Sequence, residues 1–339
     1  MKEKILLSYG SGGKHTFEFI NNFVLKYFSN DILNQLLDSA VIKISDNTKL
    51  AFSIDSYTVS PIFFPGGDIG KLSICGTIND LLCVGAKPLF ISLSLIIEEG
   101  LETEVIEKIF SSIKEVSEKE NVKIVTGDTK VVQKGMCDKI FITTAGIGVI
   151  ENNIDLNYNR IESGDFVIIT GSIAEHGCAV LLSRGAYGFK SDIQSDCASL
   201  KGLVEKVLES NFVQDIKFMR DPTRGGVAAA LNEIVNKTKG LSIEIEEEKI
   251  PIKDNVKHFC DLLGFDPLNI ANEGKMLMIV SETVAEEIVK ILKQHPLGKD
   301  AAIIGKVVSD EKPKVVLKTL YGTKRIVELP IAEELPRIC

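Results

Sequence analysis

Apolar and polar residues alternate along the first half of the chain in a way that predicts helices and strands in succession. Residues 103–118 place apolar side chains at helical spacing, which is typical of an amphipathic helix. Residues 88–97 are almost continuously apolar, which is typical of a strand buried on both faces. The same reasoning predicts helices at 16–28 and at 68–84, the second capped by Asp68, and extended segments at 50–55, 122–130 and 139–150.

The second half resumes this alternation after a polar, asparagine-rich segment at 151–160, which we interpret as a domain boundary. Its pattern predicts strands at 165–170, 276–280, 303–308, 315–319 and 325–329, and helices from 175, at 199–209 and at 223–237. We therefore expect a mixed α/β (α+β) fold with two domains, 1–155 and 156–330, and a flexible tail, 331–339. A length of 339 residues fits two domains, at roughly 150 residues each.

Composition narrows the range of partners. The formal net charge of −8 argues against a surface built for nucleic acid or for an anionic membrane. No apolar run approaches the ~18 residues of a membrane span. The first eight residues hold too short an apolar run for a secretory leader, so we expect a cytoplasmic protein without a membrane partner.

The seven cysteines include one at the very end of the chain, Cys339. No CxxC pair or zinc-ligand spacing is present, so we expect the other six to be reduced and mostly buried. Pro336 disfavours a helix in the tail, and Arg337 places a cation beside the thiol that should favour the thiolate. The tail can therefore be an arm that carries a reactive sulfur, or simply the place where the chain stops.

Three stretches of the first half carry polar groups that are candidates for binding a cation or phosphate. Asp55 ends a predicted strand, where a carboxylate is more often a turn former than a metal ligand. Asn79 and Asp80 lie among apolar residues of a predicted helix, where burial is costly unless a cation or phosphate pairs with them. Asp128 and Lys130 are two residues apart in an extended segment and so share a face, as a Mg²⁺ and phosphate pair or as a surface ion pair.

Three further features concern anions and proton transfer. Arg224, Gly225 and Gly226 begin a predicted helix, where backbone N–H groups favour an anion, although a plain capped helix is the alternative. Glu273 precedes a glycine and is either a turn residue or a catalytic carboxylate. The glycine-rich stretch at 8–15 has Ser8 and His15 where a P-loop requires Gly and Ser or Thr, so that fingerprint is absent.

Taken together, these stretches resemble the hydrogenase maturation proteins of the HypE family over essentially the whole chain. The resemblance rests on F-P-G-G-D-I-G at 64–70, G-T-I-N-D-L at 76–81, G-D-T-K-V-V at 127–132, D-P-T-R-G-G at 221–226, A-N-E-G at 271–274 and the terminal P-R-I-C. Several motifs are shared in looser form with aminoimidazole ribonucleotide synthetase and its relatives. The chain departs from the family at Ser8 and Tyr9, where a His-Gly-like start is expected.

The resemblance implies a two-domain architecture like that of aminoimidazole ribonucleotide synthetase, a homodimer formed through the N-terminal domain, and the use of ATP and Mg²⁺. It implies that a carbamoyltransferase, HypF, loads a carboxamide onto Cys339. The protein would dehydrate this group to a thiocyanate, and the cyano group would pass to iron on a HypC–HypD scaffold for the [NiFe]-hydrogenase cofactor.

The resemblance also suggests roles for individual residues. Asp55, Asp80 and Asp128 would hold Mg²⁺ and the triphosphate, with Asn79 beside them. Lys130 would stabilise developing negative charge, and Glu273 would be the base. Arg224 with the amides of Gly225 and Gly226 would bind phosphate.

Two other functions remain open at this stage. One is a related ATP-dependent synthetase or kinase that acts on a free small molecule. The other is a non-catalytic carrier that only presents Cys339 to its partners.

Overall fold

The computed structural model describes residues 4–46, 48–151, 154–185, 191–331, 335 and 337–339. Its first half forms a five-stranded sheet in the order β1-β2-β7-β5-β6, whose neighbouring strands are antiparallel except for β5 and β6. The strands are β1 (Ala40–Ser45), β2 (Thr48–Tyr57), β5 (Ala86–Glu98), β6 (Lys123–Val132) and β7 (Ile140–Ile150). The predicted strands of this half are therefore confirmed, and β1 is an addition.

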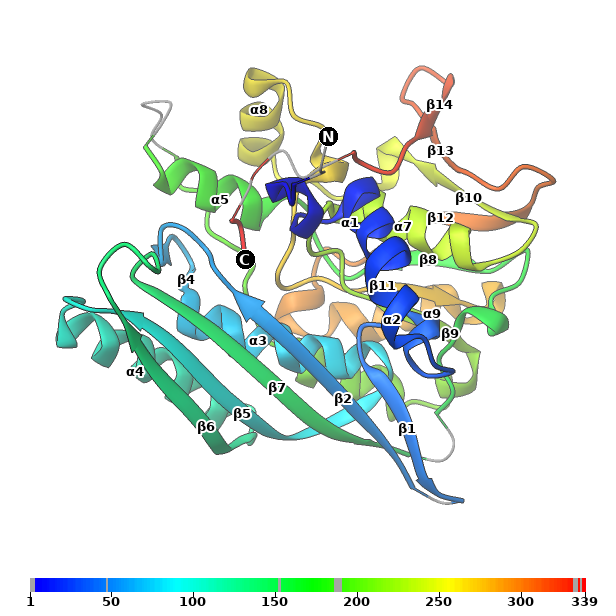
Figure 1. Ribbon diagram of the computed structural model, residues 1–339. Helices are drawn as coiled ribbons and strands as arrows, with labels where there is room; N and C mark the ends of the chain where they lie inside the picture. Colours follow the sequence, from blue (N-terminus) through cyan, green and yellow to red (C-terminus); the bar gives the residue numbers. More distant parts are fainter. Residues whose placement is uncertain (1–3, 47, 152–153, 186–190, 332–334, 336) are drawn as a thin grey trace.

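Two helices, α3 (Ile69–Cys83) and α4 (Thr103–Lys119), cover one face of this sheet (Figure 1). Asp68 caps α3 as predicted, because its Oδ1 accepts hydrogen bonds from the N–H groups of Gly70 at 2.7 Å and Lys71 at 3.1 Å. Nearly every residue of α3 is buried, which is typical of a helix packed on all sides. A small hairpin, β3 (Phe63–Phe64) and β4 (Gly67–Asp68), precedes it.

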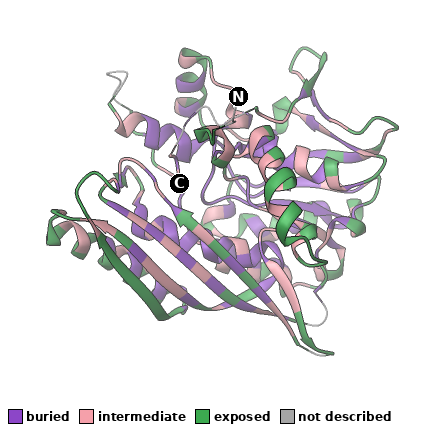
Figure 2. Cartoon of the chain, in the orientation of Figure 1, coloured by how far each residue is buried: buried purple, intermediate pink, exposed green. Residues whose placement is uncertain are grey.

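The other face of the sheet is open, as the exposed and half-buried positions on its strands show (Figure 2). Phe90 and Ile96 of β5 lie on this face and are about 40% exposed. The prediction that this strand is buried on both faces is therefore wrong for the single chain. Register places Phe52 of β2 and Ile147 of β7 beside Phe90 on the same face.

The second half forms a seven-stranded sheet in the order β14-β13-β10-β12-β8-β11-β9. Its strands are β8 (Phe166–Ile169), β9 (Ile216–Arg220), β10 (Leu241–Glu246), β11 (Leu277–Val280), β12 (Ala302–Ser309), β13 (Val315–Lys318) and β14 (Lys324–Val327). Neighbours are antiparallel except β10 and β13. The sequence pattern predicted β8 and β11 to β14 but not β9 and β10.

Five helices accompany this sheet: α5 (Glu175–Ser183), α6 (Lys201–Leu208), α7 (Gly226–Lys237), α8 (Asp254–Leu263) and α9 (Ala285–Lys293). The first three were predicted, and α8 and α9 were not. The chain begins with α1 (Gly13–Phe19), a π-helical turn and α2 (Leu25–Phe28), which lie along α7 in the second half of the molecule (Figure 1).

The two halves share one continuous apolar core, with α3 between the first sheet and the second domain. The C-terminus ends between the first sheet and α5 (Figure 1). Among the helices of the described residues, none has both the length and the apolar character needed to cross a membrane.

Candidate active site

A cavity of about 250 Å³ lies where the two domains meet. Its walls come from β2, α3, the segment between β9 and α7, the loop before β11, the N-terminal helix and the tail. Five of the residues predicted from the sequence line it together: Asp55, Asp80, Arg224, Glu273 and Cys339. Residues more than 280 positions apart in the sequence therefore converge on one site.

Asp55 and Asp80 reach the cavity from β2 and α3. The hydroxyl of Tyr57 donates to Oδ2 of Asp55 at 3.3 Å, and the hydroxyl of Ser53 donates to Oδ2 of Asp80 at 2.5 Å. Burial raises the pKa of Asp80 well above its usual value, and the nearby charges of Asp55 and Asp221 raise it further. This carboxyl group is therefore held in a setting that favours a bound cation.

Two more carboxylates in the cavity, Asp38 and Asp221, carry no role in the predictions made from the sequence. Burial is the main cause that raises the pKa of each; the charge of Asp38 raises the pKa of Asp221 further, and the charges of Glu233 and Asp55 raise the pKa of Asp38. Arg220 offsets part of this charge through an ion pair with Asp38 at 3.4 Å and a second pair with Glu233. Asp221 is the first residue of the D-P-T-R-G-G motif at 221–226, whereas Asp38 lies outside every motif and predicted element.

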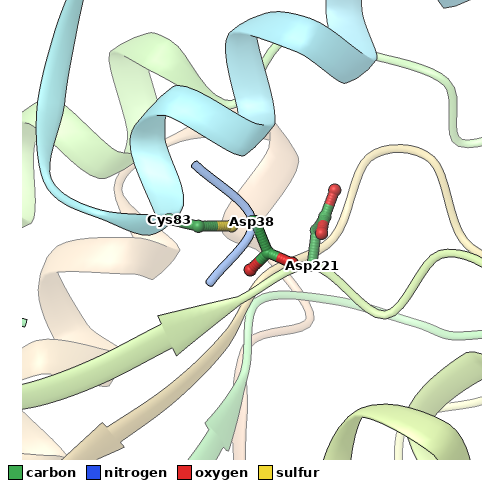
Figure 3. A group of neighbouring side chains, drawn as sticks. All are labelled: Asp38, Cys83 and Asp221. Carbon is green, nitrogen blue, oxygen red and sulfur yellow. The ribbon is translucent and has the colours of Figure 1, made fainter. Parts of the chain in front are cut away.

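The thiol of Cys83 faces the same two carboxylates (Figure 3). One ligand atom from each of Asp38, Cys83 and Asp221 lies within 4.8 Å of the others. Burial raises the pKa of Cys83 well above its usual value, so it is a neutral thiol that donates a hydrogen bond to Asp38. The carboxylate oxygens of the cavity suit a hard cation such as Mg²⁺.

Glu273 is buried, with 3% of its surface exposed, at the end of the loop before β11. The loop is held by Asp196, whose carboxylate accepts from the N–H groups of Glu273 at 3.1 Å and Gly274 at 3.2 Å. Burial raises the pKa of Glu273 well above its usual value, and the charges of Asp221, Asp196 and Asp55 add to this effect. A carboxylate tuned in this way is suited to accept a proton near neutral pH.

Asn79 is next to Asp80 in sequence but not among the residues that line the cavity. Its amide group donates to the carbonyl oxygens of Ala198 at 3.1 Å and Glu273 at 3.4 Å, and its Oδ1 accepts from the N–H of Leu200 at 2.9 Å. The structure thus places Asn79 as a link between α3 and the second domain, with its polar atoms bonded to backbone rather than directed at a ligand.

Arg224 lines the cavity and donates to the carbonyl oxygen of Gly10 at 2.8 Å. The glycines after it have φ values of +75° and +62°, a region that favours glycine. A Cβ on Gly226 would lie 2.5 Å from the carbonyl oxygen of Leu268. The N–H of Gly226 donates to Thr223, so backbone geometry accounts for both Gly225 and Gly226.

Asp128 and Lys130 lie apart from the cavity within one chain. They pair with Ser94 and Ile96 in the register of β5 and β6, which places them on the open face of the sheet. Both side chains are more than 60% exposed, and their charged groups are 2.7 Å apart. The hydrogen bond from Lys130 lowers the pKa of Asp128. Within a single chain, Asp128 and Lys130 therefore form a surface ion pair, which is one of the two alternatives that the sequence allowed.

The last three residues are docked rather than extended into solvent. The carbonyl oxygen of Cys339 accepts from the N–H of Thr58 at 3.0 Å, and Ile338 is buried with 1% exposure. Arg337 forms an ion pair with Asp138 at 2.7 Å, so its charge is balanced by this carboxylate and not held for the thiol alone. The predicted effect of Pro336 falls outside the described residues. The six other cysteines are buried, as predicted.

Comparison with known proteins assigns both halves of the chain to one family. Residues 37–150 match the N-terminal domain of the AIR synthase related proteins, and residues 162–318 match their C-terminal domain. The mixed α/β fold predicted from the sequence is therefore confirmed.

Individual proteins give a narrower assignment. The chain is 43% identical to carbamoyl dehydratase HypE of Escherichia coli, with 99% of each chain covered. It is similar to the HypE–HypF complex structure, with a TM-score of 0.86, 45% identity and coverage of 92% of this chain and 99% of that one. A HypE structure in complex with ATP matches with a TM-score of 0.81, 42% identity and coverage of 99% and 100%. The chain belongs to the HypE carbamoyl dehydratase family of hydrogenase maturation proteins.

Proposed function

We propose that the chain catalyses the ATP-dependent dehydration of a carboxamide carried on Cys339, which yields a thiocyanate and supplies cyanide ligands for [NiFe]-hydrogenase maturation. The observation that carries this proposal is the position of Cys339. Cys339 lines the same cavity as Asp55, Asp80, Arg224 and Glu273. A terminal thiol has no reason to lie among buried carboxylates unless it brings a substrate to them.

The reaction explains why these residue types are needed. The amide oxygen of the S-carboxamide is a poor leaving group, so it first takes the γ-phosphoryl group of ATP and ADP departs. The C–O bond then breaks with loss of phosphate, and the nitrogen gives up both protons as the C≡N bond forms. Glu273 and Arg224 line the cavity. Glu273 would accept a proton from this nitrogen, and Arg224 would bind phosphate oxygens.

The donor set of the cavity fits Mg²⁺, because it consists of carboxylate oxygens. Asp55 and Asp80 would hold the ion, with Asp38 and Asp221 adjacent to them. The ion would neutralise charge on the triphosphate. The raised pKa values of Asp38, Asp80 and Asp221 support this role, since a bound cation would relieve their mutual repulsion.

Asp128 and Lys130 join this site only if a second copy supplies them, so the proposal includes the predicted homodimer. The open face of the first sheet exposes apolar side chains, including Phe52, Ile54 and Phe90, that a second copy would cover. Ile54 also lines the cavity. The open face and the cavity mouth therefore adjoin, and a partner packed on this face would bring its β6 towards the site.

The partners follow from the same chemistry. A carbamoyltransferase of the HypF type would load Cys339, and a HypC–HypD complex would receive the cyano group, in the cytosol. The structure titled HypE–HypF complex supports the first of these partners.

The mass of Cys339 tests the proposal directly. Incubation with HypF and its substrates should add a carboxamide to the C-terminal peptide, and ATP with Mg²⁺ should then remove one water from that adduct. Loading that ATP leaves unchanged would contradict the dehydratase. Full ATP-dependent activity on a free small molecule after deletion of Cys339 would instead favour a related synthetase or kinase, and absence of any ATP hydrolysis would favour a carrier.

A further inference from the structure

The docked tail forms backbone hydrogen bonds along one segment of the first domain. The carbonyl oxygen of Cys339 accepts from the N–H of Thr58 at 3.0 Å, and the carbonyl oxygen of Arg337 accepts from the N–H of Ser60 at 3.1 Å. The order of these pairs is antiparallel. The tail therefore runs antiparallel beside the segment after β2, joined to it by two backbone hydrogen bonds.

The side chain of Arg337 attaches the tail at a second point. Its Nη1 donates to Oδ2 of Asp138 at 2.7 Å, and its Nε donates to the carbonyl oxygen of Thr58 at 2.9 Å. The guanidinium carbon lies 5.9 Å from the ring centre of Phe141, within reach of a cation–π contact. Arg337 has φ +56°, an uncommon value for a residue with a side chain. These contacts hold it in that conformation.

The second domain contributes two more donors to the tail. Arg184 donates to the carbonyl oxygens of Ser60 at 2.9 Å and Arg337 at 3.0 Å, which ties the tail and its neighbouring segment to α5. The Nε2 of His176 lies 2.8 Å from the carbonyl oxygen of Ile338. The docked tail is thus held by these polar contacts and by two buried apolar side chains, Leu335 and Ile338.

We propose that the Asp138–Arg337 ion pair is a latch that sets the fraction of time Cys339 spends docked at the cavity, with Arg184 as a second positioning residue. The pair is the accessible point of the attachment, because its side chains are 45% and 33% exposed whereas Ile338 is buried. An enzyme that loads Cys339 must undock the tail, and the dehydration step must have it docked. The purpose of the latch rests on the proposed function, but its existence does not.

Alkylation of Cys339 by iodoacetamide reports how accessible this thiol is in the full chain, because Cys339 is half-buried when docked and the six other cysteines are buried. Asp138→Asn should speed alkylation of the C-terminal peptide about two- to fivefold, the range expected for a partly exposed ion pair. Glu287→Gln is the matched control, because it removes a comparably exposed carboxylate that pairs with Lys290. This control should leave the rate unchanged.

Exchanging the two charges of the ion pair distinguishes a specific latch from a general destabilisation of the docked tail. Asp138→Arg combined with Arg337→Asp should bring the alkylation rate back towards the wild type, whereas each single change should raise it. An unchanged rate in Asp138→Asn, or a double variant no slower than the singles, would overturn the proposal.

Single-turnover assays add a readout tied to the reaction. In Asp138→Asn, carbamoyl loading of Cys339 should become faster relative to thiocyanate formation per loaded chain, and the ratio of the two rates should change about two- to fivefold. Equal changes of both steps in the same direction would contradict a latch. Failure of the wild type to form thiocyanate would instead count against the proposed function, since the alkylation result does not depend on it.

Discussion

At the scale of single residues, the site holds four acids, Asp38, Asp80, Asp221 and Glu273, whose pKa values are raised chiefly by burial and further by nearby negative charges. Asp80 shows the consequence for stability. Its folded-state pKa is raised, so ionising it costs more in the folded chain than in the unfolded one. The folded state therefore loses stability as pH rises from the usual aspartate pKa through the raised one.

Asp80→Asn should thus have opposite effects on stability and activity. The neutral side chain should raise the melting temperature at neutral pH in the absence of ATP and Mg²⁺, because it removes a buried charge from a like-charged group. It should lower ATP-dependent turnover at least about a hundredfold. Thermal unfolding and ATP hydrolysis assays measure the two effects, and normal turnover in a folded variant would remove Asp80 from the ATP site.

Glu273→Gln should permit carbamoyl loading of Cys339 but slow thiocyanate formation by about 10²- to 10⁴-fold. A base must be ionised to act, and burial raises the pKa of Glu273. The wild-type rate should therefore rise with pH through a midpoint above the usual range of glutamic acid. Single-turnover pH profiles of the loaded protein would show this rise, and a variant that keeps the same profile at full speed would assign the base elsewhere.

At the scale of elements, local signals in the sequence predict what lies near in the chain. The cap at Asp68 and the apolar residues after it specify α3, and the confirmed helix carries Asp80 to the cavity. Gly225 and Gly226 have positive φ values and close contacts that the turn at the start of α7 requires, and their role as phosphate-binding amides stays a prediction. Glycines at the start of a helix give the same sequence pattern whether they bind phosphate or only form the turn.

Gly226→Ala should destabilise the protein by more than about 2 kcal/mol, because the new Cβ would meet two carbonyl oxygens as well as an unfavourable φ. Gly264→Ala at the end of α8 is the control. Its φ is +74°, but a Cβ there meets no atom within 4 Å, so the cost should stay near ~1 kcal/mol. Denaturant unfolding of both variants tests the difference, and equal losses would show that φ alone decides.

The tail contains Cys339, the residue proposed to carry the substrate. Cys339→Ala should abolish thiocyanate formation and change the free energy of unfolding by less than about 0.5 kcal/mol, because the terminal side chain is only half-buried and the other six cysteines are buried away from a free end. Mass analysis of the C-terminal peptide and thermal unfolding measure both. Thiocyanate formed by the alanine variant would exclude Cys339 as the carrier.

At the scale of the whole molecule, candidate functional residues were easier to predict from the sequence than their positions relative to one another in the fold. Asp38 was missed because it lies outside any motif and approaches the cavity only when β1 and the N-terminal segment fold over it. Periodicity correctly put Asp128 and Lys130 on one face of a strand, but it could not say which face of the sheet borders the cavity. The apolar run of β5 indicated burial on both faces, whereas one face is partly exposed in the single chain.

This last point leads to a test of the proposed homodimer. Lys130 lies on the open face of its own sheet, next to Ile96, and Cys339 lies in the cavity whose mouth adjoins that face at Ile54. If Lys130 acts on the partner's Cys339, a mixture of Lys130→Ala and Cys339→Ala chains can form a heterodimer with one intact site. That site combines the thiol of the first variant with the lysine of the second.

Random exchange of equal amounts should then restore about one quarter of the wild-type rate of thiocyanate formation, because half of the dimers are mixed and each has one working site of two. Either variant alone should be inactive. Adding Ile54→Asp to both variants should prevent the recovery, since a carboxylate on the apolar open face opposes its burial against a second copy. If the mixture stays inactive although mass analysis shows mixed dimers, Lys130 acts within its own chain, and the open face of the sheet would need another explanation.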